Sequence, residues 1–183
     1  PGTPVPVGSA RTYGDGTDLT ILTYANGLYM SLRVARRLEE RHRISARVVD
    51  LRWLAPLPVE DILREAQATG RVLVVDETRR SGGVSEAVVT ALVDEGFTGP
   101  VHRVTSEDSF IPLGDAALTV LLSEDTVEAA AAQLGRLGHD LLGDLALLGD
   151  VRAGIADARD REQIFHHADE PLRLVAHVLE QLV

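Results

Sequence analysis

The sequence predicts an α/β protein whose parallel β-sheet is covered on both faces by helices. Short apolar runs rich in β-branched residues recur along the first part of the chain. Between them lie longer segments whose apolar residues repeat with the period of an amphipathic helix. Glycines stand at the boundaries between the two kinds of segment. Such an alternation is typical of βαβ crossovers, in which helices pack on both faces of the sheet.

The first two predicted strands are Leu19–Tyr24 and Ala46–Leu51, each a short run dominated by apolar and β-branched residues. The segment between them has helical periodicity, and Asn26 is expected to be the N-cap of that helix. Its polar side chains, such as Arg33 and Glu40, are expected to face solvent. The expected buried face consists of Leu28, Leu32, Ala35 and Leu38.

Two further strands are predicted at Arg71–Asp76 and Val101–Thr105. Each is preceded by an amphipathic segment, and Gly70 and Gly96 stand where helices commonly end. The Gly82-Gly83 turn separates the third strand from the second of these helices. The expected apolar stripes are Val59, Ile62, Leu63 and Ala66 in the first helix and Val84, Ala87, Val88, Ala91 and Leu92 in the second.

The pattern changes after Thr105. Residues 106–116 form a predicted loop, and Ser123 is expected to cap a helix that has Glu124 and Asp125 in its first turn. We therefore divide the chain into a linker at 1–7, an α/β domain at 8–137 and a helical tail of unknown role at 138–183. The clearest helix of the tail spans Pro171–Leu182. The expected buried stripe of the helix after Ser123 is Val127, Ala130, Ala131, Leu134 and Leu137.

Composition excludes several classes of protein. The net charge of −10 argues against a nucleic-acid partner, and no apolar run is long enough to cross a bilayer. The chain has neither Cys nor Lys, which excludes disulfides, thiolate sites, Schiff-base lysines and a Walker P-loop. The lack of a secretory signal predicts a cytoplasmic protein. The start at Pro1 instead of Met favours a fragment or a processed chain.

Three motifs could carry chemistry, and each has a purely structural interpretation beside the functional one. In thiamine-diphosphate enzymes a Gly-Asp-Gly segment begins a motif that binds the metal and the diphosphate and ends in Asn some two dozen residues later. Gly14-Asp15-Gly16 has the same three residues, but Asn26 is too close to complete the motif. We therefore interpret it as a turn. His166-His167 has poor geometry for one metal ion, because adjacent helical residues diverge by about 100°. The remaining candidate is an anion site formed by Arg79, Arg80, Gly82 and Gly83.

The alternative interpretation of that candidate anion site is a flexible turn. Its arginines would then pair with carboxylates such as Glu77 or with a neighbouring subunit. No His, Ser, Asp or Glu arrangement in the sequence defines a catalytic triad. From the residues alone we assign no catalytic, cofactor-binding or metal-binding residue.

Four segments in order carry a resemblance to a known family. They are PVGSARTYGDGTDLTILTYANG (6–27), ARVVDLRWLAPLP (46–58), TGRVLVVDETRRSGG (69–83) and RVTSEDSFIPLG (103–114). Together they resemble the C-terminal transketolase-like domain of the β subunit of thiamine-dependent 2-oxo acid dehydrogenases of the pyruvate and branched-chain type. Two features depart from the family pattern: Pro58 replaces the usual capping Asp, and the tail has no counterpart.

The resemblance implies a three-layer α/β/α domain with a mostly parallel sheet of about five strands, in which Ser9–Tyr13 is an antiparallel edge strand. It implies an assembly role in oxidative decarboxylation of a 2-oxo acid with acyl transfer to lipoamide. Thiamine diphosphate and Mg²⁺ would bind the complete enzyme and not this chain, which alone would be inactive. The implied partners are the α subunit, the N-terminal part of the β subunit, further copies of the chain and the lipoyl acyltransferase core.

The polar residues expected to face other domains are Asp50, Arg52, Glu77, Arg79, Arg80 and Asp108, and for each an internal salt bridge is the alternative. The alternative function is a free-standing protein-interaction or anion-binding regulatory module on the same fold.

Overall fold

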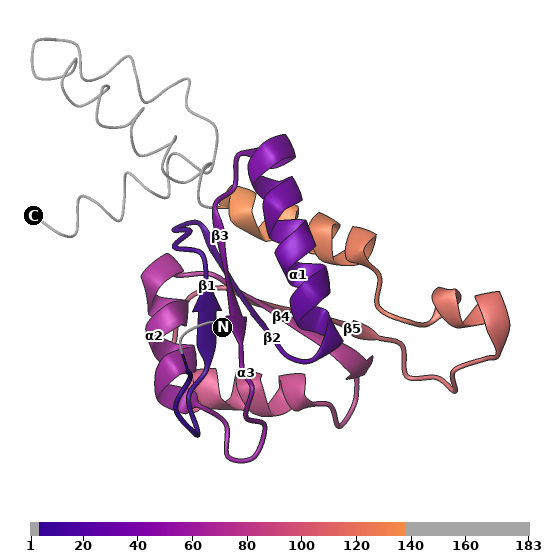
Figure 1. Ribbon diagram of the computed structural model, residues 1–183, viewed down its shortest axis with the longest axis horizontal. Helices are drawn as coiled ribbons and strands as arrows, with labels where there is room; N and C mark the ends of the chain where they lie inside the picture. The colour runs from indigo at the N-terminus through magenta and orange to yellow at the C-terminus, as the bar shows by residue number, and fades with distance from the viewer. Residues whose placement is uncertain (1–3, 138–183) are drawn as a thin grey trace, which may run out of the picture. The chain divides into compact units, whose positions relative to one another are not determined.

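The computed structural model describes residues 4–137, which form one sheet with helices on both faces (Figure 1). The predicted tail at 138–183, with His166-His167, lies outside the described residues. Residues 124–137 form a further helix, which follows η2 (Gly114–Thr119). The elements are β1 (Arg11–Tyr13), β2 (Leu19–Thr23), α1 (Asn26–Arg37), η1 (Leu38–His42), β3 (Ala46–Asp50), α2 (Val59–Thr69), β4 (Val72–Arg79), α3 (Val84–Asp94), β5 (Val101–Ser106) and η2 (Gly114–Thr119).

The sheet has five strands in the order β1-β3-β2-β4-β5. β2, β3, β4 and β5 pair in parallel. β1 runs antiparallel to β3 with Arg11 opposite Asp50, which confirms the antiparallel edge strand. The chain first adds β3 on one side of β2 and then crosses to add β4 on the other side. The order therefore reverses between β2 and β4.

The core consists of two apolar layers on opposite faces of the sheet. Alternation along β4 sends Leu73 and Val75 to one face and Val72 and Val74 to the other. α1 and the helix of residues 124–137 cover the first face, and α2 and α3 cover the second (Figure 1). This arrangement confirms the predicted three-layer α/β/α fold.

Helix ends follow the predicted signals in part. Gly70 ends α2 in the left-handed region at φ 68°, and its N–H donates to the carbonyl of Ala66. Gly96 has φ 74°, and Ser123 Oγ accepts the N–H of Thr126 at 3.1 Å. The prediction that Asn26 caps α1 is wrong. The helix begins at Asn26 itself, and the Asn26 N–H is bound by Glu77 Oε1 of β4 at 3.3 Å, so the acceptor comes from a distant strand.

Other differences concern which side chains are buried. In α1 the fully buried residues are Ser31 and Val34, whereas Leu32 and Ala35 are half-buried. Leu28 and Leu38 are buried as expected, and Leu32 and Ala35 pack against the same core, so the buried face is the expected one, extended on one side by Met30, Ser31 and Val34. Ala87 of α3 and Leu137 are exposed, although both were expected in apolar stripes. β4 runs three residues beyond the predicted end at Asp76, through an irregularity between Asp76 and Arg79.

Ion pairs join α1 and η1 to the helix of residues 124–137. Glu124 pairs with Arg33 and Arg37, and Glu128 pairs with Arg37 and Arg41. Hydrogen bonding from Arg33 lowers the pKa of Glu124. Burial alone would raise the pKa of Glu128, but the charges of Arg41 and Arg37 outweigh it and lower that pKa. These pairs supplement the apolar contacts of the same helix, in which Val127, Ala131 and Leu134 are buried in the core.

Candidate functional site

The predicted interface residues all lie at one edge of the sheet. Asp50 is the last residue of β3, and Arg52 follows that strand. Glu77 and Arg79 are among the last three residues of β4. Because β2, β3, β4 and β5 are parallel, their carboxyl ends meet at the same edge, which is where open α/β sheets bind ligands and partners. Residues that follow these strands, Arg80 after β4 and Asp108 after β5, extend the same edge.

Asp76 is the fully buried carboxylate of this edge. Its Oδ1 accepts the hydroxyl of Tyr24 at 2.5 Å, and the N–H and hydroxyl of Thr78 at 2.9 and 2.8 Å. Its Oδ2 accepts the N–H of Ser85, in the first turn of α3, at 2.8 Å. Both oxygens are thus satisfied, and the carboxylate ties β2 and α3 to β4.

The ionisation of this pair is set by its surroundings. Burial alone would raise the pKa of Asp76, but the hydrogen bonds to it, first that of Tyr24, outweigh burial and lower the pKa. Burial and the adjacent carboxylate raise the pKa of Tyr24. Asp76 is therefore an anion and Tyr24 a neutral donor at neutral pH. Sequence reasoning assigned Asp76 only to the end of a strand, although an acidic residue directly after four apolar ones was the available signal.

Glu77 and Asp50 make contacts within the domain. Glu77 binds the N–H of Asn26, and its carbonyl accepts the Ser106 hydroxyl at 2.9 Å. Asp50 Oδ1 accepts the N–H of Arg52 at 3.2 Å. Arg52 has φ 58°, a left-handed backbone, and its side chain is exposed. Glu77 therefore helps to build the edge, whereas Arg52 extends from it into solvent.

The turn after β4 is held by Asp108. The N–H of Ser81 donates to Asp108 Oδ1 at 2.8 Å, and its hydroxyl donates to Oδ2 at 2.6 Å. These bonds lower the pKa of Asp108. Arg79 donates from Nε to the carbonyl of Ser81 at 3.0 Å. Within this turn, an external anion would compete with Asp108 for the Ser81 donors and with Asp76 for Ser85 N–H.

The four residues of the predicted anion site lie together in this turn, with Gly82 in the left-handed region at φ 70°. Arg79 and Arg80 are exposed, and the structure brings Arg103 Nη1 to 3.4 Å from the Arg80 carbonyl. Gly83 is tightly enclosed, because a Cβ there would lie 2.8 Å from the carboxylate of Asp76 and 2.7 Å from Thr78 Oγ1. The glycine pair thus lets the chain turn closely over the buried carboxylate.

Residues 107–121 form a loop that extends from the carboxyl end of β5 (Figure 1). Its neck is closed by the N–H of Glu107, which donates to the carbonyl of Val120 at 2.8 Å. Ser106 Oγ accepts the N–H of Leu122 at 3.0 Å just beyond it. A loop whose ends meet in this way is an Ω-loop. We refer to residues 107–121 as the β5 loop.

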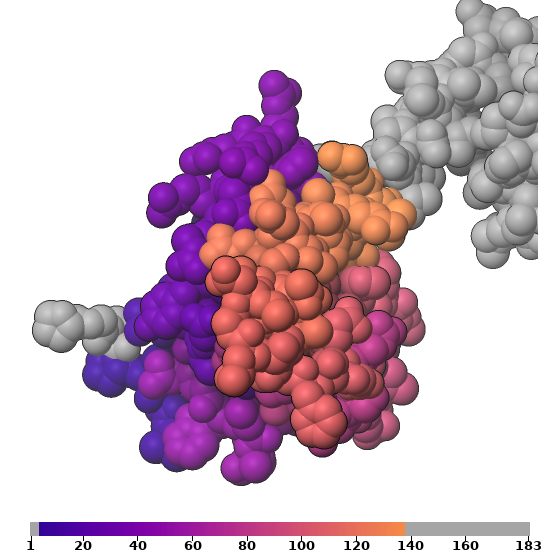
Figure 2. Space-filling view, turned by 90° about the vertical axis from the view of Figure 1, so that its right-hand side faces the viewer, coloured from indigo at the N-terminus to yellow at the C-terminus, as the bar shows by residue number. Residues whose placement is uncertain are grey.

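The β5 loop exposes large apolar side chains. Phe110 is 97% exposed and Leu113 is 96% exposed. In Figure 2 the loop (salmon) forms much of the surface that faces the viewer. Large apolar side chains exposed together on one loop are common where proteins contact other molecules. The sequence predicted a loop at 106–116, which covers the first part of this segment, but did not predict its exposed apolar surface. The exposed large apolar residues of the loop are Phe110, Ile111, Leu113, Leu118 and Leu121.

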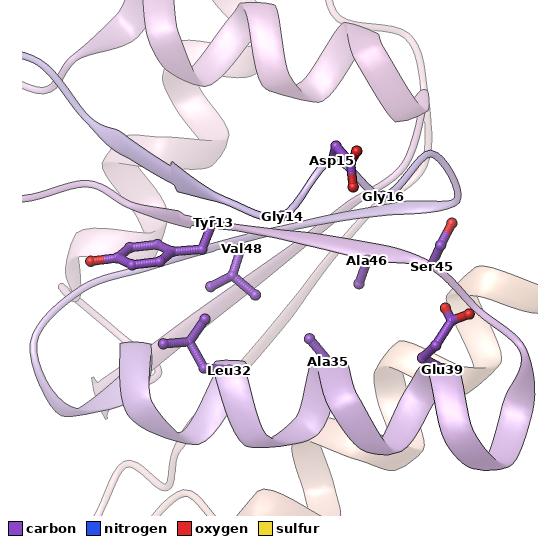
Figure 3. A pocket seen from close by; sticks show the side chains of 10 residues that line it. All are labelled: Tyr13, Gly14, Asp15, Gly16, Leu32, Ala35, Glu39, Ser45, Ala46 and Val48. Carbon is purple, nitrogen blue, oxygen red and sulfur yellow. The ribbon is translucent and has the colours of Figure 1, made fainter. Parts of the chain in front are cut away.

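The Gly14-Asp15-Gly16 segment connects β1 to β2 and borders a pocket of about 280 Å³ between the sheet edge and α1 (Figure 3). Tyr13, Leu32 and Ala35 form its apolar wall. A Cβ on Gly16 would lie 2.5 Å from the backbone of Ala46. The carbonyls of Asp15 and Gly16 are bound by Arg47.

This close packing leaves no room for a diphosphate at Gly16, so the segment does not fit a magnesium–diphosphate site. Among residues 4–137 there is no group of three or more His, Cys, Asp or Glu side chains placed to hold a metal ion. No helix within the same residues is long and apolar enough to span a membrane.

Comparison with known proteins identifies relatives of this fold. Residues 8–127 match the family described as "Transketolase, C-terminal domain". The pyruvate dehydrogenase E1 component subunit beta of Bacillus subtilis is 35% identical over 130 residues, which are 69% of this chain and 40% of that protein. The 2-oxoisovalerate dehydrogenase subunit beta of the same organism is 34% identical over 137 residues, 71% of this chain and 41% of that protein.

Two further matches widen the comparison. The 1-deoxy-D-xylulose-5-phosphate synthase of Gloeobacter violaceus is 40% identical over 108 residues, 59% of this chain and 17% of that protein. A solved structure described as "Split gene transketolase, inactive beta4 tetramer" superposes with a TM-score of 0.64 at 31% identity, over 73% of this chain and 43% of that one. The chain therefore spans less than half the length of these relatives, and it belongs to the transketolase C-terminal domain family.

Proposed function

We propose that this chain is the C-terminal assembly domain of the β subunit of a thiamine-diphosphate-dependent 2-oxo acid dehydrogenase. It contributes subunit interfaces and no catalytic group. The complete enzyme decarboxylates a 2-oxo acid oxidatively and transfers the acyl group to lipoamide. This chain corresponds to 40% and 41% of the length of two β subunits of such enzymes but to only 17% and 19% of two synthases, which supports the choice.

The observation that carries the proposal is the apolar surface of the β5 loop. Phe110 and Leu113 are almost fully exposed, although burying each would stabilise a contact by about 2 kcal/mol. Arg79, Asp108 and Phe110 line one pocket, so apolar and charged groups share one surface at the sheet edge. A polar rim around an apolar centre is the usual composition of a specific protein interface.

The partners at this surface are the α subunit and the N-terminal part of the β subunit, with further copies of the chain and the lipoyl acyltransferase core at other contacts. Thiamine diphosphate and Mg²⁺ bind the complete enzyme through residues that this chain does not supply. The assembly works in the cytoplasm. Asp50, Arg52, Glu77, Arg79, Arg80 and Asp108 are the polar residues that face these partners or support the surface.

The proposal is tested by sedimentation velocity of the purified chain mixed with the α subunit and the N-terminal part of the β subunit. We expect the chain to co-sediment with both. Replacing Phe110 and Leu113 by Ser should weaken this association by about 30-fold or more, because central apolar anchors dominate interface energies. Val93→Ser removes another exposed apolar side chain, on α3, and should leave association unchanged. Unchanged association of the double variant would contradict the proposal.

A calorimetric titration tests the cofactor part. The chain alone should give no binding heat with thiamine diphosphate and Mg²⁺, whereas the reconstituted complex should bind both and decarboxylate a 2-oxo acid. Saturable micromolar binding by the isolated chain would contradict an assembly role without cofactor contacts.

A second candidate follows from the similarity to 1-deoxy-D-xylulose-5-phosphate synthase. The same assembly role would then serve an enzyme that forms 1-deoxy-D-xylulose 5-phosphate. Assaying the reconstituted complex for that product and for acyl-lipoamide separates the two candidates.

The anion-binding module is the third candidate, with Arg79, Arg80, Gly82 and Gly83 as its site. Because Asp108 already binds the Ser81 donors, inorganic phosphate should bind the Asp108→Asn variant more tightly than the unaltered chain. Saturable binding of phosphate by the unaltered chain, lost in the Arg79→Ala, Arg80→Ala variant, would favour this candidate over the assembly domain.

A further inference from the structure

Ser81 is an exposed serine directly preceded by Arg79 and Arg80. It lies in the turn between β4 and α3, which contains left-handed Gly82 and whose residues 80–82 are all exposed. Its hydroxyl donates to Asp108 Oδ2 at 2.6 Å, and its N–H donates to Asp108 Oδ1 at 2.8 Å. A hydroxyl on an exposed turn after two arginines has the charge pattern that arginine-directed protein kinases select.

The Ser81–Asp108 contact connects the turn to the start of the β5 loop. Asp108 follows Glu107, whose N–H closes the neck of the loop on Val120. The N–H of Ser109 donates to the Glu107 carbonyl at 2.8 Å, so the residues around Asp108 are ordered as a unit. Within residues 4–137, the two Ser81–Asp108 hydrogen bonds therefore join the turn before α3 to the β5 loop.

We propose that Ser81 is a phosphorylation site that controls the position of the β5 loop. Ser81 Oγ attacks the γ-phosphorus of a nucleoside triphosphate held by an arginine-directed serine kinase. The new O–P bond forms as the bond from that phosphorus to the β-phosphate oxygen breaks, and the nucleoside diphosphate leaves. The hydroxyl proton passes to the general base of the kinase. An effect of this phosphorylation on binding of partner subunits would rest on the proposed function, whereas the phosphorylation itself does not depend on it.

Phosphorylation reverses the electrostatics of this contact. The hydroxyl that donates to Asp108 becomes a phosphate with a charge of about −1.5 to −2, which repels the carboxylate. Arg79, Arg80 and Arg103, which lie in or beside the turn, offer the phosphate new partners. The phosphate therefore pairs with the arginines and Asp108 separates from the turn, which opens the neck of the β5 loop.

The first test is a kinase reaction on the full chain with ATP and the catalytic subunit of cyclic-AMP-dependent protein kinase, which requires arginines N-terminal to the serine. Mass spectrometry should find one phosphate, on Ser81. Ser81→Ala should lose it, and Ser109→Ala should keep it, because Ser109 is an exposed serine of the same surface without preceding arginines. Replacing Arg79 and Arg80 by Ala should slow the reaction at least about tenfold. No phosphate, or phosphate that persists in Ser81→Ala, would overturn the proposal.

The second test uses the chain carrying phosphoserine at position 81, introduced during translation. Amide hydrogen exchange of Glu107 and Leu122 should accelerate about fivefold relative to the unmodified chain, as expected for the loss of one net hydrogen bond. Unchanged exchange at both amides would overturn the proposed control of the loop. Neither test needs a partner subunit. If both succeed while the sedimentation experiment fails, the proposed function is wrong and the modification stands; the reverse result rejects only the modification.

Discussion

The Tyr24 hydroxyl donates a hydrogen bond of 2.5 Å to Asp76 Oδ1, across the two strands between which the order of the sheet reverses. Tyr24 follows β2 and Asp76 lies in β4, so the bond joins the carboxyl ends of neighbouring parallel strands. Open α/β sheets commonly place a ligand at this point. In this chain the position holds a buried carboxylate whose oxygens are both bound by the protein itself.

Replacing Asp76 by Asn should destabilise the domain by about 2–3 kcal/mol. The amide keeps one acceptor for Tyr24 but places a donor against the N–H of Ser85, which then has no acceptor. Tyr24→Phe removes a single donor and should cost about 1–1.5 kcal/mol. Urea unfolding followed by circular dichroism measures both values. If both variants lost the same unfolding free energy, the result would contradict the argument that Asp76 holds more than one of these hydrogen bonds.

The stability should be nearly constant from neutral pH down to about pH 5 and should fall below that. Asp76, Glu65, Glu124 and Glu128 all have a pKa below the ordinary carboxyl value in the folded chain. The unfolded chain therefore binds protons first as the pH falls. The stability that these groups contribute is complete above the unfolded pKa and is lost as the pH falls through the folded pKa.

Urea unfolding at a series of pH values between 7 and 3 checks this expectation. The Asp76→Asn variant should show a smaller loss of stability over the same interval, because it lacks one of the groups that titrate. A stability that rises on acidification would contradict the sign argued here.

The order of strands and helices could be predicted because its signals are local, whereas the antiparallel edge strand was predicted only from the family resemblance. The apolar run Arg71–Asp76 and the glycine at position 70 identify a strand and a helix end without knowledge of the rest of the chain. Contacts between distant residues were not predictable in this way. The acceptor that binds Asn26 N–H is Glu77, and the partner of Ser81 is Asp108, which no periodicity reveals. The exposure of Phe110 likewise depends on how the β5 loop leaves the sheet.

Arg37 should contribute more to stability than Arg36, its neighbour in α1. Arg37 bonds Glu124 at 2.8 Å and Glu128 at 2.6 Å and is 22% exposed, whereas Arg36 is exposed. Arg37→Ala should cost about 1 kcal/mol, at the upper end for partly exposed pairs, and Arg36→Ala less than about 0.5 kcal/mol. Thermal unfolding in low and high salt measures this, and the difference should shrink with salt. Equal effects of the two substitutions would show that the pairs do not stabilise the helix of residues 124–137.

Glycines 16 and 82 should respond differently to replacement by Ala. A Cβ at Gly16 would lie 2.5–2.6 Å from backbone atoms of Ser45 and Ala46, which cannot move without displacing β3. Gly16→Ala should therefore cost about 2–3 kcal/mol through overpacking. At Gly82 the nearest atom is Arg79 Nη2 at 3.9 Å, so the cost there comes from the left-handed backbone at φ 70° and should be about 1 kcal/mol. Urea unfolding of the two variants measures both costs, and a Gly16→Ala variant as stable as Gly82→Ala would mean that the connection from β1 to β2 yields instead of packing rigidly against β3.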